Sequence, residues 1–252
     1  MKKLFLKILF VSLLQSFFVS NAQISQLFRN KDRVEQRQEQ DTYPFSYGFF
    51  LNLNNFDYKM VLNPKYGMYN NQNLVQSKLT YSFGAGLIAK MRLNNNFDLR
   101  LEPGLQFVDR ELTFDTQVNS PQLTLTNADR IRKVKSTYVD VPLLLEFHMD
   151  RWYNSRPYVA GGFNYMMNLQ SNAKSADDNQ QGIFRSTTHN FGWSAEMGIQ
   201  FYFSRFKLTP GFRGTFFFNN EMVADNAGTP PYWTAAINTM QTRAFMFVLK
   251  FE

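Results

Sequence analysis

Among the residues whose chemistry could support catalysis, the two histidines of this 252-residue chain come first. His148 lies two residues after Glu146, and the nearest serine in the sequence is Ser155. Barrel enzymes that act on lipid combine a serine, a histidine and a third orienting group, but Ser155 falls in an expected turn. His189 stands at the start of an expected strand, where a hydrogen bond at a rim accounts for it. We therefore expect no enzymatic activity and predict a buried, hydrogen-bonded role for His148.

Other chemical sites leave little trace in the sequence. The absence of cysteine excludes disulfides, thiolate nucleophiles and zinc–thiolate sites. The glycine-rich pieces 84–86 and 161–162 lack the strand–loop–helix context of a phosphate cradle, and no metal-ligand spacing is visible, so we expect no cofactor. The net charge of +7 includes three lysines of the first 22 residues. With no basic run interleaved with aromatics, we expect no nucleic-acid partner. The sequence identifies no small-molecule substrate.

A set of charged residues of both signs shares one face of successive strand-like runs. Side chains of a strand alternate between its two faces, so these charges lie opposite a continuous apolar face. In a small barrel such a face lines a narrow interior that side chains fill. We predict a structural charge network in that lumen rather than acid–base catalysis. The predicted members are Lys90, Arg92, Arg100, Glu102, Asp140, Glu146, Glu196, Lys207 and Arg213.

Eight runs of alternating apolar and polar residues supply the strands that would position these charges. The runs cover residues 46–54, 78–93, 97–114, 136–149, 157–168, 188–203, 206–220 and 237–251. In the second run, for example, Tyr81, Phe83 and Leu87 share one face, and Lys90 and Arg92 share the other.

The links between the runs alternate in length. Short links follow the second, fourth and sixth runs, and long links follow the first, third, fifth and seventh. Tight turns on one side and long loops on the other are typical of a membrane barrel with an even number of strands. We therefore predict an all-β fold: an eight-stranded antiparallel transmembrane β-barrel with short periplasmic turns and four longer extracellular loops. The turns are expected at 94–96, 150–156 and 204–205, and the loops at about 55–77, 115–135, 169–187 and 221–236.

A soluble lipocalin-like barrel is the alternative that this pattern leaves open. Against it, the runs are about twice as long as the ~5–6 residues of an ordinary globular strand. Aromatic residues make up 17% of the chain, yet no apolar run after residue 22 approaches the ~18 residues of a transmembrane helix. These features favour a barrel whose apolar side chains face lipid, with outer-membrane lipid as a partner.

Prolines and aromatics add two further expectations. Pro103, Pro142 and Pro210 lie inside predicted strands although proline cannot donate to a ladder, and we predict a bulge or sharp bend at Pro103 and Pro210. Aromatic residues near the run ends predict two girdles at the membrane surfaces. The periplasmic girdle would comprise Phe97, Trp152, Tyr153, Phe201, Phe203, Phe206 and Phe251, and the outer one Tyr138, Tyr165, Phe191, Trp193, Phe216 and Phe218.

The N-terminal region predicts export. Residues 1–22 combine a charged start, an apolar stretch and the small-residue cleavage site Ser-Asn-Ala, which is typical of a secretory signal peptide. Residues 23–44 form a polar periplasmic tether, and residues 45–252 form the barrel. An even number of strands brings both termini to the same, periplasmic side.

Four segments resemble the PorT family of outer-membrane proteins of Bacteroidota. They are FSYGFFLNLN (45–54), YVDVPLLLEF (138–147), RPYVAGG (156–162) and GIQFYFSRFKLTPGFR (198–213). The resemblance covers about residues 43–252 and is most specific in the last segment. It implies an outer-membrane barrel needed for the type IX secretion system, through which adhesins, proteases and gliding-motility proteins cross the outer membrane. The family supplies no catalytic residues to carry over.

The resemblance implies an accessory role in secretion, because the lumen of an eight-stranded barrel is filled by side chains and too narrow for folded cargo. Other subunits of the secretion machine would then be partners, bound through the loops or the tether. A general structural or adhesive barrel with no role in secretion is the first alternative. A barrel enzyme acting on lipid is the second.

Overall fold

The computed structural model describes residues 37–78, 80–115, 130–176, 184–226, 228 and 233–252. The predicted signal peptide and most of the predicted tether lie outside these ranges. Helical structure in the described part comprises two short 3-10 turns, η1 (Gln38–Thr42) and η2 (Thr234–Ala236). None of the helices found there is long and apolar enough to cross a membrane.

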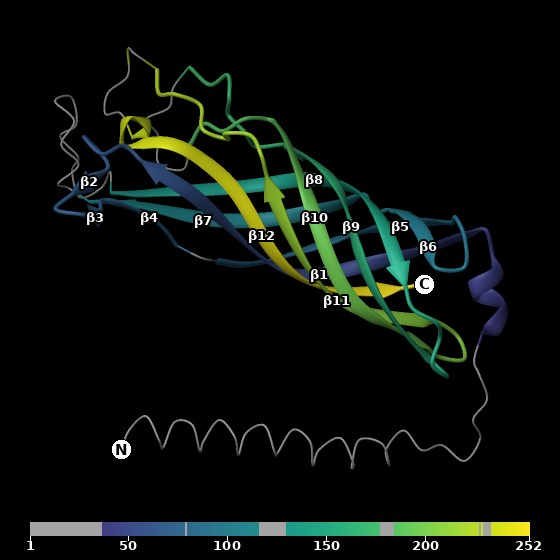
Figure 1. The fold of residues 1–252 in the computed structure, drawn as a ribbon. Coiled ribbons are helices and arrows are strands. Elements are labelled where there is room, and N and C mark those ends of the chain that lie inside the picture. Colours follow the sequence, from purple (N-terminus) through teal and green to yellow (C-terminus); the bar gives the residue numbers. More distant parts are fainter. Residues whose placement is uncertain (1–36, 79, 116–129, 177–183, 227, 229–232) are drawn as a thin grey trace, which may run out of the picture. The chain divides into compact units, whose positions relative to one another are not determined.

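The described residues form a closed ring of eight antiparallel barrel strands, which confirms the predicted fold class (Figure 1). Two of the eight are each divided into two segments. The strands are β1 (Phe45–Leu62), β4 (Val75–Lys78) with β5 (Thr80–Arg92), β6 (Phe97–Leu101) with β7 (Gly104–Phe114), β8 (Ile131–His148), β9 (Ser155–Asn168), β10 (His189–Tyr202), β11 (Lys207–Phe217) and β12 (Ile237–Phe251). Each pairs with its neighbours along the chain, and β1 pairs with both β5 and β12, which closes the sheet.

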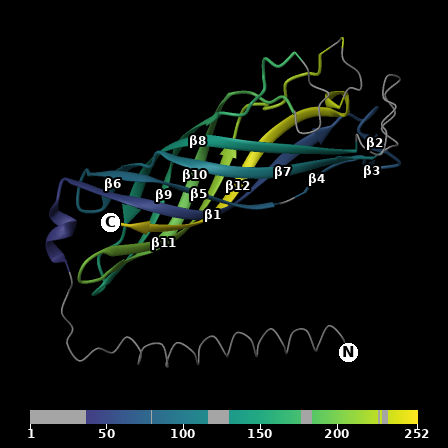
Figure 2. The same cartoon turned by 180° about the vertical axis from the view of Figure 1, so that it is seen from behind.

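The links sort the barrel into two ends, as the link lengths predicted (Figures 1 and 2). The links 93–96, 149–154 and 203–206 lie at the end where η1 and Glu252 also lie, which we call the turn end. The strand ends that the longer links join lie at the opposite end, which we call the loop end. The first of these links carries a small hairpin of β2 (Met68–Tyr69) and β3 (Gln72–Asn73).

Two of the predicted loops are shorter than expected because their flanking strands continue further. β1 runs on to Leu62, and β8 begins at Ile131. Inward residues of the extension of β1, such as Phe56 and Tyr58, remain buried while Lys59 on the outward face is exposed. The strand thus continues beyond the point where its outward face stops being apolar.

The prolines interrupt strands without inserting a residue. Leu101 pairs with Leu143 and Gly104 with Asp140, so the register against β8 is the same on both sides of Pro103. The flanks of Pro210 likewise keep one register against β10. The prediction of a bulge at Pro103 or Pro210 is therefore wrong, because a bulge would shift the register by one residue; the sharp bend stays a prediction. The N–H of Leu87 still donates to the carbonyl of Pro103 at 2.9 Å.

A bulge does form where no proline is present, between β5 and β7. Phe83 pairs with Phe107 in one register, and Lys78 of β4 pairs with Glu111 in a register that differs by one residue. One extra residue therefore lies on the side of β4 and β5, and the ladder is interrupted around Ser82.

The burial pattern is inverted relative to a soluble protein. Outward side chains are large and apolar, with Tyr81 86% and Phe163 75% exposed. Inward side chains include Arg100 and Glu102, which are 1% and 0% exposed. Soluble proteins seldom bury such charges and seldom expose a continuous apolar wall. The wall is therefore a lipid-facing surface, and the soluble alternative does not describe this chain.

The interior is layered along the barrel. Apolar side chains fill the loop end, including Tyr58, Phe114, Phe184, Trp233 and Met240. A second apolar group lies further along the lumen, including Phe50, Phe56, Tyr138, Met166 and Met246. The largest group of buried charged residues lies toward the turn end, where the candidate site lies.

Candidate functional site

Six buried ionic side chains from five strands form one cluster inside the barrel, which we call the lumen cluster. Its members are Arg100, Glu102, Glu146, Glu196, Arg213 and Lys250. Three are acids and three are bases, so the cluster is neutral. All six come from inward positions of their strands, where alternation places every second side chain.

Glu196 lies at the centre of the lumen cluster. Its Oε1 accepts from Arg100 at 2.6 Å, and its Oε2 accepts from Arg213 Nε at 2.7 Å. Lys250 and the Tyr158 hydroxyl also donate to Oε1, the latter at 2.6 Å. Both carboxylate oxygens are therefore used, which is the condition under which a buried charge is tolerated.

The other two acids of the cluster are held in the same way. Arg100 Nε lies 2.6 Å from Glu102, and Lys250 lies 3.1 Å from it. Glu146 is paired with Arg100 and accepts from Gln200 at 2.5 Å. Because each acid contacts side chains of other strands, the cluster cross-links the barrel through its centre.

A second ionic group lies at the turn end. Lys90 is 3.5 Å from Asp98 and 3.4 Å from Glu252, and Lys207 also pairs with Glu252. Burial alone would raise the pKa of the Glu252 carboxyl, but Lys207 and Lys90 hold it well below its usual range. His148 Nε2 donates to the Asp98 carboxylate at 3.0 Å, which agrees with the buried, hydrogen-bonded role predicted for this histidine.

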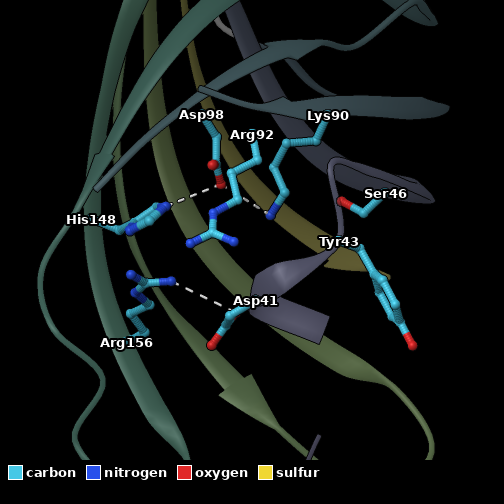
Figure 3. Close-up of a pocket in the computed structure, with 8 residues that line it drawn as sticks. All are labelled: Asp41, Tyr43, Ser46, Lys90, Arg92, Asp98, His148 and Arg156. Carbon is cyan, nitrogen blue, oxygen red and sulfur yellow. Dashed lines mark hydrogen bonds and ion pairs between the residues drawn. The ribbon is translucent and has the colours of Figure 1, made fainter. Parts of the chain in front are cut away.

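A small pocket opens beside this group, as Figure 3 shows. It is lined by Asp41, Tyr43, Ser46, Lys90, Arg92, Asp98, His148 and Arg156. Its volume of about 20 Å³ is enough for roughly one water molecule. The Ser46 hydroxyl and His148 Nδ1 are buried without a protein partner, so a water is the occupant that the pocket suits.

The polar turn η1 closes one side of this pocket through Asp41. Asp41 accepts from the Tyr202 hydroxyl at 2.7 Å and lies 3.4 Å from Arg151 and 3.6 Å from Arg156. Arg37, just before η1, donates to the backbone carbonyl of Glu252 at 3.2 Å. The described part of the predicted tether is thus fixed to the turn end of the barrel.

Asp98, Glu146 and His148 are close enough together to be considered as metal ligands. The donor set does not favour a cation there, because Lys90 lies 3.5 Å from Asp98 and Arg100 is paired with Glu146. A divalent ion would have to displace these cations in a site that they already neutralise. The three residues are best explained as members of the ionic groups described above.

The structure brings seven of the nine predicted lumen residues into ion pairs: five belong to the lumen cluster, and Lys90 and Lys207 belong to the group at the turn end. Arg92 does not join them: it lies at the mouth of the turn end, where it donates to Asn95 at 2.7 Å. Asp140 is buried and accepts a long 3.5 Å hydrogen bond from Gln106. The predicted residues that belong to the lumen cluster are Arg100, Glu102, Glu146, Glu196 and Arg213.

Sequence reasoning missed several members. Lys250 stands on a face of the last strand that is otherwise apolar at Met246 and Val248, so no polar pattern marked it. Tyr158 occupies an inward position of β9. The alternation of inward and outward side chains along that strand was the only feature of the sequence that could have indicated its place in the cluster. The prediction that Tyr138 belongs to the outer aromatic girdle is wrong. Tyr138 is fully buried, because it occupies one of the inward positions of β8.

Tyr138 instead belongs to a polar group nearer the loop end. Arg110 donates to the Tyr138 hydroxyl and to Thr242 at 2.9 Å, and its guanidinium lies 3.9 Å from the ring centre of Tyr58. Glu221, in the link between β11 and β12, accepts from the backbone N–H of Thr242 at 3.1 Å. Burial raises the pKa of the Glu221 carboxyl, and Arg110 partly opposes this.

The second histidine lies outside the lumen. His189 Nδ1 is 2.8 Å from the Tyr165 hydroxyl on the exposed face of the barrel. The two histidines thus have an aspartate and a tyrosine as their hydrogen-bond partners. Chemically, the site as a whole fills and cross-links the lumen.

Several solved membrane barrels are similar to this chain. The outer membrane protein OprG from Pseudomonas aeruginosa shares 11% identity with a TM-score of 0.44, covering 81% of this chain and 94% of its own. AlkL, solved in lipid bilayers, shares 14% identity with a TM-score of 0.38, covering 81% and 88%. The attachment invasion locus protein Ail of Yersinia pestis shares 9% identity with a TM-score of 0.37, covering 81% and 96%.

No curated protein sequence matches the chain. A family match is present over residues 22–223, most of the chain, to the family described as outer membrane protein beta-barrel domain. The inverted burial and the closed ring of eight strands agree with this match. This chain belongs to the outer membrane protein beta-barrel domain family.

Proposed function

We propose that this outer-membrane barrel is a non-enzymatic accessory component of protein secretion across the outer membrane, of the type IX kind that its resemblance to the PorT family implies. The observation that carries the proposal is the lumen cluster, in which Glu196 is bonded by Arg100, Arg213 and Lys250. A lumen filled in this way leaves no path for a polypeptide. The protein then acts through its loops, its rim and the tether.

The proposed orientation places the turn end and both termini in the periplasm, after removal of the signal peptide 1–22. Short turns of bacterial barrels face the periplasm, and the Asp41 contacts hold the described end of the tether at that same end. The tether would thereby be presented to periplasmic partners. Epitope tags inserted at 94–96 and in the link 169–187 test this: on intact cells, only the second should bind antibody.

The absence of enzymatic activity is part of the proposal. His148 is engaged with Asp98, and His189 with Tyr165, so neither histidine is paired with a serine nucleophile in the described structure. Replacing both histidines by alanine should leave the secretion phenotype intact. Loss of a lipid-hydrolysing activity in that variant would favour the enzyme alternative instead.

Deletion of the gene tests the secretion role directly. The secreted proteome and surface motility should be lost in the deletion strain and restored by the wild-type chain. Purification of the tagged barrel in mild detergent should recover other subunits of the secretion machine. An unchanged secretome would overturn the proposal and leave a structural or adhesive barrel.

A planar-bilayer recording supplies the matching control. The wild-type barrel should show no ion conductance, because the lumen cluster blocks the interior. Steady conductance steps from the wild-type protein would contradict the closed lumen on which the proposal depends.

A further inference from the structure

The outer wall has a notch where the ladder between β5 and β7 is interrupted. At the bulge described above, the backbone N–H of Asp109 donates to the Ser82 hydroxyl at 3.4 Å. In hydrocarbon, backbone polar groups that lose their ladder partners need others. Polar side chains such as Ser82 therefore belong at this position of the wall.

A depression of about 370 Å³ lies at this notch. Three aromatic side chains line one part of it: Tyr81, Phe83 and Phe107 are 86%, 59% and 40% exposed. Polar side chains line the rest, including Asp109 and Lys135. The depression is thus amphipathic, with an aromatic side and a polar side.

The depression lies where the outward wall changes from apolar to charged. On β7 the outward face passes from Phe107 to Asp109 and Glu111, and on β8 from Val139 through Thr137 to Lys135. This change marks the membrane surface nearer the loop end. A lipid seated there has its headgroup beside the polar residues and its acyl chains beside the aromatic ones.

The polar side of the depression suits an uncharged, hydroxyl-rich headgroup. Lys135 and Asp109 are 3.9 Å apart with side chains 70% and 51% exposed, and their charges cancel. An exposed pair of this kind contributes little to stability, so both groups stay available as donor and acceptor. Gln170 and Thr137 add further hydrogen-bonding groups to the lining.

The aromatic side suits a sugar ring. The C–H bonds of a pyranose carry slight positive charge and pack against the negative face of an aromatic ring. Tyr81 is the most exposed of the large hydrophobic side chains in the described part of the chain. Its ring beside a set of hydrogen-bonding groups provides both contacts that a sugar headgroup uses.

We propose that this notch binds the sugar headgroup of a membrane glycolipid in the leaflet nearer the loop end, with the acyl chains lying along Phe83 and Phe107. The full-length mature barrel is placed in phosphatidylcholine nanodiscs containing equal fractions of monogalactosyl diacylglycerol and phosphatidylglycerol. Native mass spectrometry after release counts each lipid retained. The wild type should retain the galactolipid in preference to both phospholipids.

Matched variants locate the binding. Tyr81→Ala and Asp109→Ala should each lower galactolipid retention about tenfold, the effect of losing roughly one good contact. Phe163→Ala removes an aromatic from β9 on the same wall that is 75% exposed, against 86% for Tyr81, and should leave retention unchanged. Heat-modifiable gel mobility checks that each variant is folded.

Three results would overturn the proposal. One is equal retention by the wild type, Tyr81→Ala and Phe163→Ala. Another is preferential retention of phosphatidylglycerol that Lys135→Gln abolishes, which would assign the notch to anionic lipid. The third is no retention of any lipid above phosphatidylcholine, which would leave water as the partner of the interrupted ladder.

Discussion

Arg100 donates to Glu196 across the barrel lumen at 2.6 Å, although 96 positions separate the two residues in the chain. The contact joins β6 to β10, strands that are not neighbours in the ring. Ladder hydrogen bonds hold each strand only to the two beside it, whereas this pair acts across the interior. The lumen cluster therefore stabilises the barrel in a direction that the sheet alone does not.

Replacing Glu196 by alanine should be strongly destabilising. The change removes one of the two acids that Arg100 and Arg213 share, the other being Glu102, and leaves the cluster with one more buried cation than anions. Breaking a buried ion pair typically costs about 3–5 kcal/mol. Urea unfolding in lipid vesicles, followed by gel mobility, measures the loss. Lys78→Ala is the control, because its 3.5 Å pair with Glu111 has the lysine 69% exposed and should contribute about 0–1 kcal/mol. Equal effects of the two variants would contradict the prediction.

Tyr158→Phe tests how tightly the cluster is coupled. The Tyr158 hydroxyl donates to Glu196 at 2.6 Å, and loss of a hydrogen bond to a charged group costs about 1.5–3 kcal/mol. Combined with Glu196→Ala, the same change should cost much less, because its acceptor is already gone. Additive unfolding free energies in the double variant would show that the hydroxyl is not part of the cluster.

Asp41→Ala should release η1 from the turn end while leaving the barrel intact. The carboxylate accepts from Tyr202 and faces Arg151 and Arg156, so its removal takes away the acidic partner of all three. Limited proteolysis should then cut near η1 faster than in the wild type. Glu39→Ala, an exposed acid in the same turn, is the matched control and should not change the cutting rate. Equal cutting rates in the two variants would argue against a role for Asp41 in holding η1 to the barrel.

Glu221 should make the stability of the loop end depend on pH. Burial raises the pKa of its carboxyl, so the folded state favours the protonated form more than the unfolded chain does. Its contribution is greatest below the ordinary carboxyl pKa and is lost as pH rises through the raised value. Glu221→Gln keeps the acceptor for Thr242 without the charge. It should increase amide-exchange protection around Thr242 at neutral pH and flatten the pH profile there; an unchanged profile would refute this.

Alternation along each strand was enough to predict the wall and the inward face. Glu102, Glu146 and Glu196 were found in this way, because parity within a strand decides the face on which a side chain lies. Parity says nothing of height along the barrel, which is why Arg92 was placed in the network although it lies at the mouth. Height depends on the tilt and stagger of the whole ring.

Contacts across the lumen and the notch in the wall had no signal in the sequence. The pairing of Arg100 with Glu196 depends on the diameter of the barrel, and this diameter cannot be predicted from the sequence of any one strand. The bulge near Ser82 lies in a stretch without glycine or proline, the residues that usually mark such irregularities. It follows from how β4 and β5 register against β7, a property of two strands together.

The seam between β1 and β12 has a consequence for how the molecule is assembled. It pairs Phe49 with Phe251, from opposite ends of the described chain. Hairpins with short links, such as β9 with β8, bring together residues that are near in sequence and can form early, whereas a seam this distant carries the largest loop-closure entropy and forms late. Until it does, two long strand edges remain unpaired and able to add foreign strands. The period between synthesis and closure is therefore when this chain most needs the protection of other proteins.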